Sequence, residues 1–474
     1  MLPNKQIEIQ RGWGIHCPGE RRPKRPPKVL VLGAGMAGLV AARILHDTGF
    51  EVQVLEARSR LGGRIWTVSN LGGPVDMGAS WIHGMYGNPL TKWCRSLGIP
   101  VRRFPVGLTR FLQQGHIRYL PGLALRSWRG IARCILRYLF LGYAGQGKRK
   151  GKKRESPYLS DLFGPLIKNP SIPSLDRQLL HWFKLLQEGI NGAPAEVVAL
   201  SELEIPNYLA PNGVPLTGFG ALVEDAARGL NIVLRCEVQK IVQKDNSVYI
   251  HTTRGIFHGD VAVVTFPLSI LRETRFFPPL PYRKRIAIES IGYGMPGVLN
   301  KVAIRLQRRM CPDNWERLAL LPSSENKDTP FVLWTNMYSL LRAPVLVGYI
   351  AGQQAAEMDL CASEEDMLDS AIKTLTYMFN KSVGKIVAWK VTCWLSDPWA
   401  RGSYSFENGE SSAEDRLALF NPINERIYFA GEATHPTHYG TVHGALLSGE
   451  QVAMAIHKRY CCNLRKRPST PWNT

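Results

Sequence analysis

Three glycines in the spacing GxGxxG, Gly33, Gly35 and Gly38, are of the type and spacing that bind phosphates. In a turn from strand to helix, the first permits the tight bend, the second lets the backbone approach a pyrophosphate, and the third lets the helix pack against the sheet. Free N–H groups at the helix start, where Ala37 lies, then face the phosphates. The four residues are candidates for binding a dinucleotide.

The elements that must position these glycines follow in the required order. Residues 28–32 are typical of a strand buried on both faces, residues 36–46 suit a helix, and residues 50–55 alternate as a second strand. This strand delivers Glu56 about 20 residues after the glycines, where a carboxylate binds ribose hydroxyls and disfavours a 2′-phosphate. A lone glycine motif is weak evidence, but the complete order predicts a phosphate-binding βαβ unit.

Two more glycines and three arginines follow in the run Glu56-Ala-Arg-Ser-Arg-Leu-Gly-Gly-Arg64, an extension that a nicotinamide dehydrogenase does not need. This run resembles the N-terminal signature of the flavin-dependent amine oxidase superfamily. The resemblance implies FAD, with Arg58, Gly63 and Arg64 beside it and the arginines paired with its pyrophosphate.

A second motif, near the C-terminus, resembles the same superfamily. Residues 426–434 (RIYFAGEAT) begin as a strand and end in a turn at Gly431 and Glu432, which in the family holds the pyrophosphate end and ribityl chain of FAD. Residues 435–453 indicate a helix whose N-terminus faces the flavin, which makes Thr441 and Val442 candidates. The resemblance also implies a backbone contact of Val238 with adenine.

Residues 394–406 (WLSDPWARGSYSF) resemble the polyamine oxidases and lysine-specific histone demethylases, and add Trp394 and Trp399 as cofactor candidates. Related monoamine oxidases tether FAD through a cysteine where this chain has Ser403, so we expect non-covalent FAD. Tyr404 and Tyr439 match two aromatic positions that steer the substrate amine near the flavin. Aromatic walls exclude water and tolerate a cation, although either tyrosine alone would more simply pack in a core.

Lys301, within residues 297–302 (GVLNKV), matches a lysine that holds a water against flavin N5 in the same group. A buried amine of this kind has a depressed pKa; the alternative is a surface lysine at a strand end. His83, in the WIHG tetrapeptide of residues 81–84, resembles a substrate-channel histidine of animal-type polyamine oxidases. Glu202 is a weaker candidate for binding a remote ammonium group, because surface exposure is the common fate of such acids.

Composition sets these candidates in a strongly basic chain. The 474 residues include 59 Lys and Arg against 38 Asp and Glu, a formal net charge of +21, which predicts attraction to nucleic acid or acidic lipid and is at odds with a polycationic substrate. The nine cysteines include no CxxC, and no metal site or disulfide framework is predicted. The first 27 residues lack the apolar core of a secretory signal, and no apolar run spans a bilayer. We expect a cytoplasmic protein, peripheral to a membrane if its basic surface binds one.

Residues 126–154 concentrate the positive charge, as arginines at helical spacing followed by the run GKRKGKKR. They predict either a basic amphipathic element that contacts an anionic membrane or nucleic acid, or a solvated helix face and loop.

The predicted fold class is α/β: a Rossmann-like FAD-binding domain intertwined with an α+β substrate domain, in the monoamine/polyamine oxidase-like two-domain arrangement. Residues 28–95, 212–280 and 396–460 are assigned to the FAD-binding domain, and 96–211 and 281–395 to the substrate-binding domain. Residues 1–27 are predicted to be a disordered basic leader and 461–474 a basic tail.

The resemblance implies an FAD-dependent amine oxidase, first of all a polyamine oxidase, with a small-molecule amine and dioxygen as its substrates. Hydride passes from the carbon beside the amine to flavin N5, the imine hydrolyses to an aldehyde and a smaller amine, and dioxygen yields hydrogen peroxide. Alternatives are an L-amino-acid oxidase, which needs an arginine clamp, and a histone-demethylase-like enzyme, although the chain lacks room for that family's added domains. A class-distinct alternative is a catalytically silent FAD-binding module that docks on nucleic acid or membrane.

Overall fold

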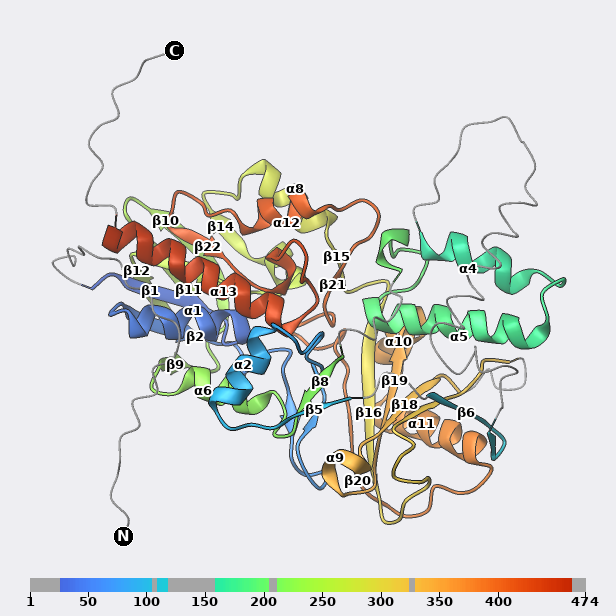
Figure 1. The fold of residues 1–474 in the computed structure, drawn as a ribbon. Helices are drawn as coiled ribbons and strands as arrows, with labels where there is room; N and C mark the ends of the chain where they lie inside the picture. The colour runs from blue at the N-terminus through green and yellow to red at the C-terminus, as the bar shows by residue number, and fades with distance from the viewer. Residues whose placement is uncertain (1–25, 105–108, 118–157, 204–210, 324–328, 463–474) are drawn as a thin grey trace, which may run out of the picture.

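Two β-sheets of different kinds organise the protein, each with its own helices (Figure 1). The computed structural model describes residues 26–104, 109–117, 158–203, 211–323 and 329–462. The basic stretch at 126–154, nearly all of the leader and most of the basic tail lie outside these described residues. No helix in the described ranges is long and apolar enough to cross a membrane.

The first sheet is wholly parallel and contains both motifs. Its order is β22 (Ile427–Phe429), β13 (Val261–Val264), β1 (Lys28–Leu32), β2 (Glu51–Leu55) and β9 (Asn231–Val233). Every pair in it runs parallel, so the turns that follow β1 and β22 emerge at the same edge. The predicted βαβ unit is confirmed, with α1 spanning Met36–Asp47.

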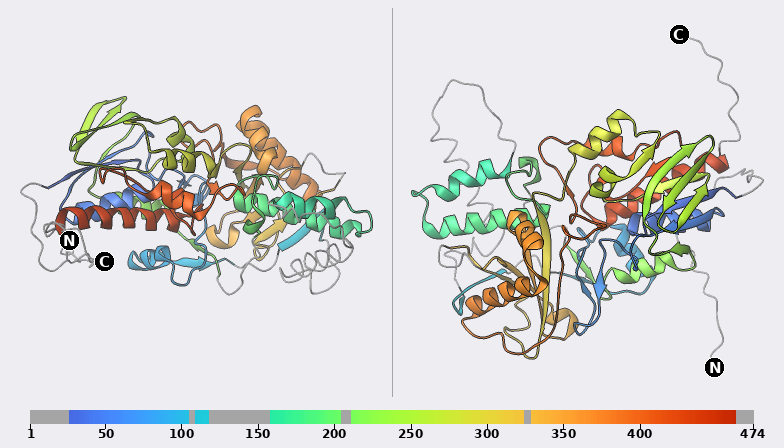
Figure 2. Two further views of the ribbon diagram at one scale, coloured as in Figure 1. Left: turned by 90° about the horizontal axis from the view of Figure 1, so that it is seen from above. Right: turned by 180° about the vertical axis from the view of Figure 1, so that it is seen from behind.

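Side chains of successive residues in β1 point to opposite faces of this sheet, and each face is covered by a different layer. Val29 and Val31 join the apolar cluster of α1, α6 (Gly220–Ala227) and α13 (Val442–His457), whereas Leu30 and Leu32 join that of β10 (Val238–Lys244) and β11 (Ser247–Thr252). Strands β10 and β11 belong to a separate four-stranded sheet, together with β12 (Gly255–Gly259) and β14 (Arg275–Phe277). Figure 2 shows it on the side of the parallel sheet away from α13.

The second sheet has seven strands. Their order is β20 (Ile386–Val391), β16 (Val298–Leu306), β19 (Val345–Ala351), β18 (Leu333–Asn336), β17 (Arg317–Ala319), β6 (Thr109–Gln113) and β7 (His116–Ile117). Helices α10 (Gly352–Cys361) and α11 (Glu364–Phe379) share one apolar cluster with it. Helices α4 (Leu159–Lys168) and α5 (Ser174–Asn191) share another, around Phe111 and Ala319.

The other helices and strands of the described residues are short. They are β3 (Thr67–Val68), β4 (Val75–Asp76), α2 (Pro89–Ser96), β5 (Val101–Arg103), η1 (Leu200–Glu202), β8 (Gly213–Pro215), α7 (Leu268–Glu273), α8 (Tyr282–Ser290), β15 (Gly292–Tyr293), α9 (Tyr338–Leu341), β21 (Ser405–Phe406), α12 (Ala413–Phe420), η3 (Glu432–Thr434) and η4 (Lys458–Cys462).

The placement of α8 differs from the expected boundary at residue 281. Ala287 and Ile288 of α8 belong to the apolar cluster that contains Val264 of the parallel sheet, and Lys284 donates to carbonyls at the end of α12. The following strand β15 pairs with β21. Residues 282–293 therefore lie with the first body, because α8 buries its apolar side there.

Close packing of α1 on α13 gives a stability prediction. A Cβ at Gly449 would lie 2.3 Å from the carbonyl oxygen of Ala37. We expect Gly449→Ala to lower the free energy of unfolding by about 1–3 kcal/mol, because helix backbones would have to separate. The control is Gly164→Ala, where a Cβ meets nothing within 4 Å and which should be neutral or mildly stabilising. Thermal unfolding followed by circular dichroism measures both, and equal melting temperatures would contradict the prediction.

Candidate functional site

One cavity of about 1090 Å³ extends from the edge of the parallel sheet to the wall of the seven-stranded sheet. Every candidate site residue from the sequence lines it except Gly38. A Cβ at Gly38 would lie 2.0 Å from the carbonyl oxygen of Gly33, so Gly38 serves the close packing of α1 instead. The structure thus brings residues from both ends of the chain to one site.

The glycine turn leaves backbone open to the cavity. Gly33 has φ +107°, and a Cβ there would approach the Thr265 hydroxyl at 2.5 Å. At Gly35, the N-cap of α1, the nearest atom to a Cβ is 4.0 Å away. Glu56 is buried at the end of β2, where its carboxylate accepts from the N–H of Ala34 at 2.7 Å and of Arg58 at 2.8 Å. A carboxylate and glycine backbone that lines the cavity therefore meet at this edge, as a dinucleotide requires.

The arginines after Glu56 have carboxylate partners from the C-terminal part of the chain. Arg58 makes a two-pronged ion pair with Asp397, at 2.7 and 2.6 Å, and lies over the Trp399 ring. Arg64 donates to Glu432 at 2.7 Å. We expected these arginines to pair with a pyrophosphate; in the structure, Arg58 joins the N-terminal motif to residues 394–406, and Arg64 joins it to the C-terminal motif.

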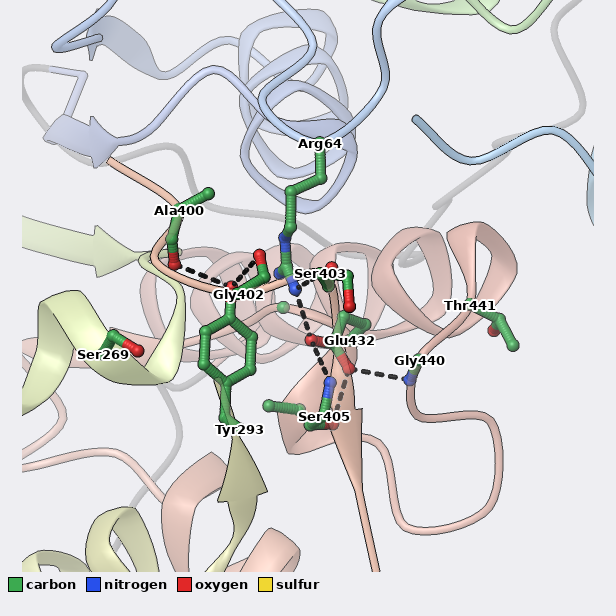
Figure 3. A network of polar contacts seen from close by, with 12 residues as sticks. Arg64, Ser269, Tyr293, Ala400, Gly402, Ser403, Ser405, Glu432, Gly440 and Thr441 are labelled. Carbon is green, nitrogen blue, oxygen red and sulfur yellow. Dashed lines mark hydrogen bonds and ion pairs between the residues drawn. The ribbon is translucent and has the colours of Figure 1, made fainter. Parts of the chain in front are cut away.

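Glu432 is the centre of a buried polar network (Figure 3). Besides Arg64, its carboxylate accepts from the Ser405 hydroxyl at 2.6 Å and the Gly440 N–H at 2.7 Å. Burial alone would raise the pKa of Glu432, but Arg64 and these hydrogen bonds outweigh it and lower the pKa below its ordinary value. The charged carboxylate of Glu432 therefore binds Ser405, which precedes the C-terminal motif, and Gly440, which follows it.

Lys301 is buried on β16, opposite Tyr349 of β19. Its ammonium donates to the carbonyl oxygens of Asp76 at 3.1 Å and Gly78 at 2.5 Å, and contacts the Ser80 hydroxyl. Burial lowers the pKa of Lys301 to about 8, and burial likewise raises that of the nearby Asp76 to about 6. The predicted depression of the lysine pKa is confirmed, and the reading as a surface lysine is wrong.

Tyr404 and Tyr439 both reach the cavity, each held by its hydroxyl. Tyr404 donates to the carbonyl oxygen of Gly189 at 2.6 Å, at the end of α5. Tyr439 donates to a Glu202 carboxylate oxygen at 2.6 Å, while the guanidinium of Arg416 covers its ring at 3.7 Å from the centroid. Burial raises the pKa of Glu202, an effect that the Tyr439 hydrogen bond and Arg416 oppose.

Histidines form a second group on the cavity wall. His83 lines it, and burial lowers its pKa. His443, at the start of α13, contacts the His438 ring at 4.6 Å between centroids, and burial together with neighbouring imidazoles lowers its pKa to about 4. Within the described ranges, no group of histidine, cysteine and acidic residues could hold a metal ion. The lowered pKa values favour neutral imidazoles at His83 and His443.

Sequence reasoning missed several lining residues. His438 and His443 lie inside the quoted C-terminal segment but carry no distinctive spacing, whereas Arg317 and Tyr349 enter the cavity only through the register of the seven-stranded sheet. Arg416 does not line the cavity but lies against Tyr439, and the sequence gives no signal for it, because a fully buried arginine is rare.

The cavity walls fit FAD. Gly431 has φ +137° with no atom within 4 Å of a Cβ, so the C-terminal turn leaves open space, as the glycine turn does at Gly35. Thr441 caps α13 by accepting from the Gly444 N–H at 3.0 Å, which points this helix start at the cavity. The residue beside Tyr404 is Ser403, whose hydroxyl accepts from the Leu299 N–H at 3.2 Å, and non-covalent attachment stays a prediction.

Comparison with known proteins agrees with this geometry. Residues 36–457 match the family described as flavin containing amine oxidoreductase. Polyamine oxidase 4 of Oryza sativa subsp. japonica is 30% identical over 93% of this chain and 90% of that protein, and polyamine oxidase 2 of Arabidopsis thaliana is 30% identical over 93% and 91%. Lysine-specific histone demethylase 1 homolog 1 of Oryza sativa subsp. japonica is 29% identical over 93% of this chain but 53% of that protein. The chain belongs to the flavin-containing amine oxidoreductase family, as an FAD-dependent enzyme that oxidises amines.

Proposed function

We propose that the protein is a polyamine oxidase with the two-domain arrangement of the monoamine and polyamine oxidases. The observation that carries the proposal is the Glu202 carboxylate, held by Tyr439 on the wall of the cavity that also contains the glycine turn. An ammonium group is the natural partner of a partly buried carboxylate beside aromatic rings.

Residues from both motifs would hold the cofactor: the glycine turn and Glu56 at the ribose and pyrophosphate, Gly431 at the pyrophosphate end and ribityl chain, and Thr441 and Val442 near the flavin. Bound FAD would accept the hydride from the carbon beside the substrate nitrogen and pass its electrons to dioxygen. The chain supplies position and a dry slot: Tyr404 and Trp182 line the walls, and Glu202 orients one end of the amine. Buried, neutral imidazoles at His83 and His443 add no repelling charge.

Arg317 supports a second candidate substrate, an amino acid. It lines the same cavity near Tyr349, at the end next to the seven-stranded sheet. A guanidinium beside a tyrosine hydroxyl is suited to a substrate carboxylate, which is the clamp that an L-amino-acid oxidase needs. The cavity wall thus has a carboxylate at Glu202 and a guanidinium at Arg317. Substrate tests must therefore include both amines and amino acids.

Anaerobic mixing of the purified, FAD-loaded protein with spermine tests the function directly. We expect the visible flavin absorbance to bleach, because oxidation of the amine reduces the flavin whatever the final acceptor is. An amino-acid panel is the parallel arm. Bleaching by amino acids alone would establish the Arg317 alternative, and no bleaching by either would reject both.

Glu202→Gln tests ammonium recognition. We expect kcat/KM for the amine to fall roughly 10- to 100-fold, mostly through KM, because a charge-assisted contact is lost. Since the pKa of Glu202 is raised, the carboxylate of the wild-type protein is neutralised as pH falls through that raised value, so kcat/KM should fall at a pH above the ordinary glutamate range. The variant should lack this acid limb. Glu196→Gln, at a carboxylate 58% exposed, is the control and should behave as wild type; an acid limb retained in Glu202→Gln would exclude Glu202.

Lys301→Met tests the buried amine. Reduction of dioxygen develops negative charge, which an ammonium stabilises, so wild-type flavin reoxidation should slow as pH rises through about 8. The variant should keep FAD but reoxidise roughly 100-fold more slowly, without that pH dependence. Stopped-flow absorbance measures both rates. Lys390→Met, on the neighbouring strand β20 and paired with Glu364, is the control; wild-type rates in Lys301→Met would remove Lys301 from the site.

A further inference from the structure

Arg416 of α12 is fully buried at 0% exposure, directly behind the cavity wall. One Nη donates to the Ser405 hydroxyl at 3.0 Å and to the Ala433 carbonyl oxygen at 3.2 Å. The other Nη lies 3.6 Å from a Glu407 oxygen, and neither it nor Nε has a hydrogen-bond partner among the described residues. A buried guanidinium with incomplete hydrogen bonding is costly, so stability alone is a poor reason for it.

The position of this guanidinium relates it to the amine slot. It covers the Tyr439 ring at 3.7 Å from the centroid, and the hydroxyl of that ring donates to Glu202. The ring is thus held on one face by a cation and at its tip by a carboxylate. Neither Tyr439 nor Glu202 can turn away without breaking one of these contacts.

The charged groups around Arg416 also relate it to amine recognition. The titratable groups facing Arg416 are Glu432 of η3, Glu407 after β21, Glu202 of η1 and Tyr439. Arg64 pairs with Glu432, so three carboxylates face two guanidinium groups, which leaves one negative charge in excess. A substrate ammonium would complete the balance.

We infer that Arg416 is a positioning residue for amine recognition: it fixes the Tyr439 ring and supplies the positive charge that balances Glu202. This inference rests on the proposed function, in which Glu202 binds the substrate ammonium. It also ties that function to the cofactor site, because Arg416 donates to Ser405. Ser405 in turn donates to Glu432, the partner of Arg64 (Figure 3).

The pH profile of kcat/KM for spermine tests the electrostatic part, using FAD-loaded protein. Arg416 opposes the rise in the pKa of Glu202, so its removal raises that pKa further. We expect Arg416→Met to move the acid limb upward by about one pH unit, an effect that loss of packing alone would not produce. Arg283→Met is the matched control. Arg283 of α8 pairs at 3.3 Å with Asp415, the neighbour of Arg416 in α12, but the Arg283 side chain is 60% exposed. Its loss should leave the acid limb unmoved. A limb that stays in place in folded, FAD-loaded Arg416→Met overturns the inference.

Arg416→Lys keeps the charge and tests the positioning part if the methionine variant does not fold. Lysine lacks the planar guanidinium that stacks on the Tyr439 ring. We therefore expect KM to rise roughly 3- to 10-fold, with kcat nearly unchanged and the acid limb in place. A wild-type KM in this variant would overturn the positioning role.

A double variant separates this inference from the proposed function. Arg416→Met added to Glu202→Gln should move no acid limb, because the titrating group is gone; a limb that still moves would show that Arg416 acts on another group. If Glu202→Gln alone has wild-type kinetics, the proposed function of Glu202 fails. If it is impaired while Arg416→Met is silent, only the role of Arg416 fails.

Discussion

The ion pair between Arg64 and Glu432 is the contact on which the site depends. Its partners are 368 positions apart in the chain, and the buried carboxylate of Glu432 also accepts from Ser405 and Gly440. Unpairing either member would leave a buried charge without compensation, which is among the most destabilising changes available to a protein. The run that follows Glu56 and the C-terminal turn are therefore held together by an ion pair between two residues that line the cavity.

The pairing of strands in the two sheets places the other walls of the cavity. Once β22 lies beside β13 in the parallel sheet, the turn after β22 and the start of α13 face the glycine turn after β1. The seven-stranded sheet then supplies the opposite wall through β16 and β19, with Lys301 and Tyr349 side by side in register. Both bodies thus line the same cavity.

Sequence reasoning reached the features that are local. The glycine spacing, Glu56 and the two flanking strands form a continuous segment with its own physical logic, and the turn at Gly431 and Glu432 is equally compact. The sequence does not identify the protein partners of these residues: the pairing of Arg58 with Asp397 joins positions 339 apart in the chain. Glu202 and Tyr439 were both candidates, yet nothing in a sequence places residues 237 positions apart in one hydrogen bond. Arg416 was invisible, because an arginine on a helix is ordinarily solvent-exposed.

The parallel sheet also has a consequence for how the protein is made. Strand β13 pairs with β1 on one side, and its other partner, β22, comes from residues 427–429 near the end of the chain. During synthesis, one edge of β13, a strand of four apolar residues, stays unpaired until β22 has been made. The segment between the two strands is more than a third of the chain. Such an edge can pair with any other strand nearby, so the newly made chain is most prone to aggregation just before it acquires the segment that completes its cofactor site.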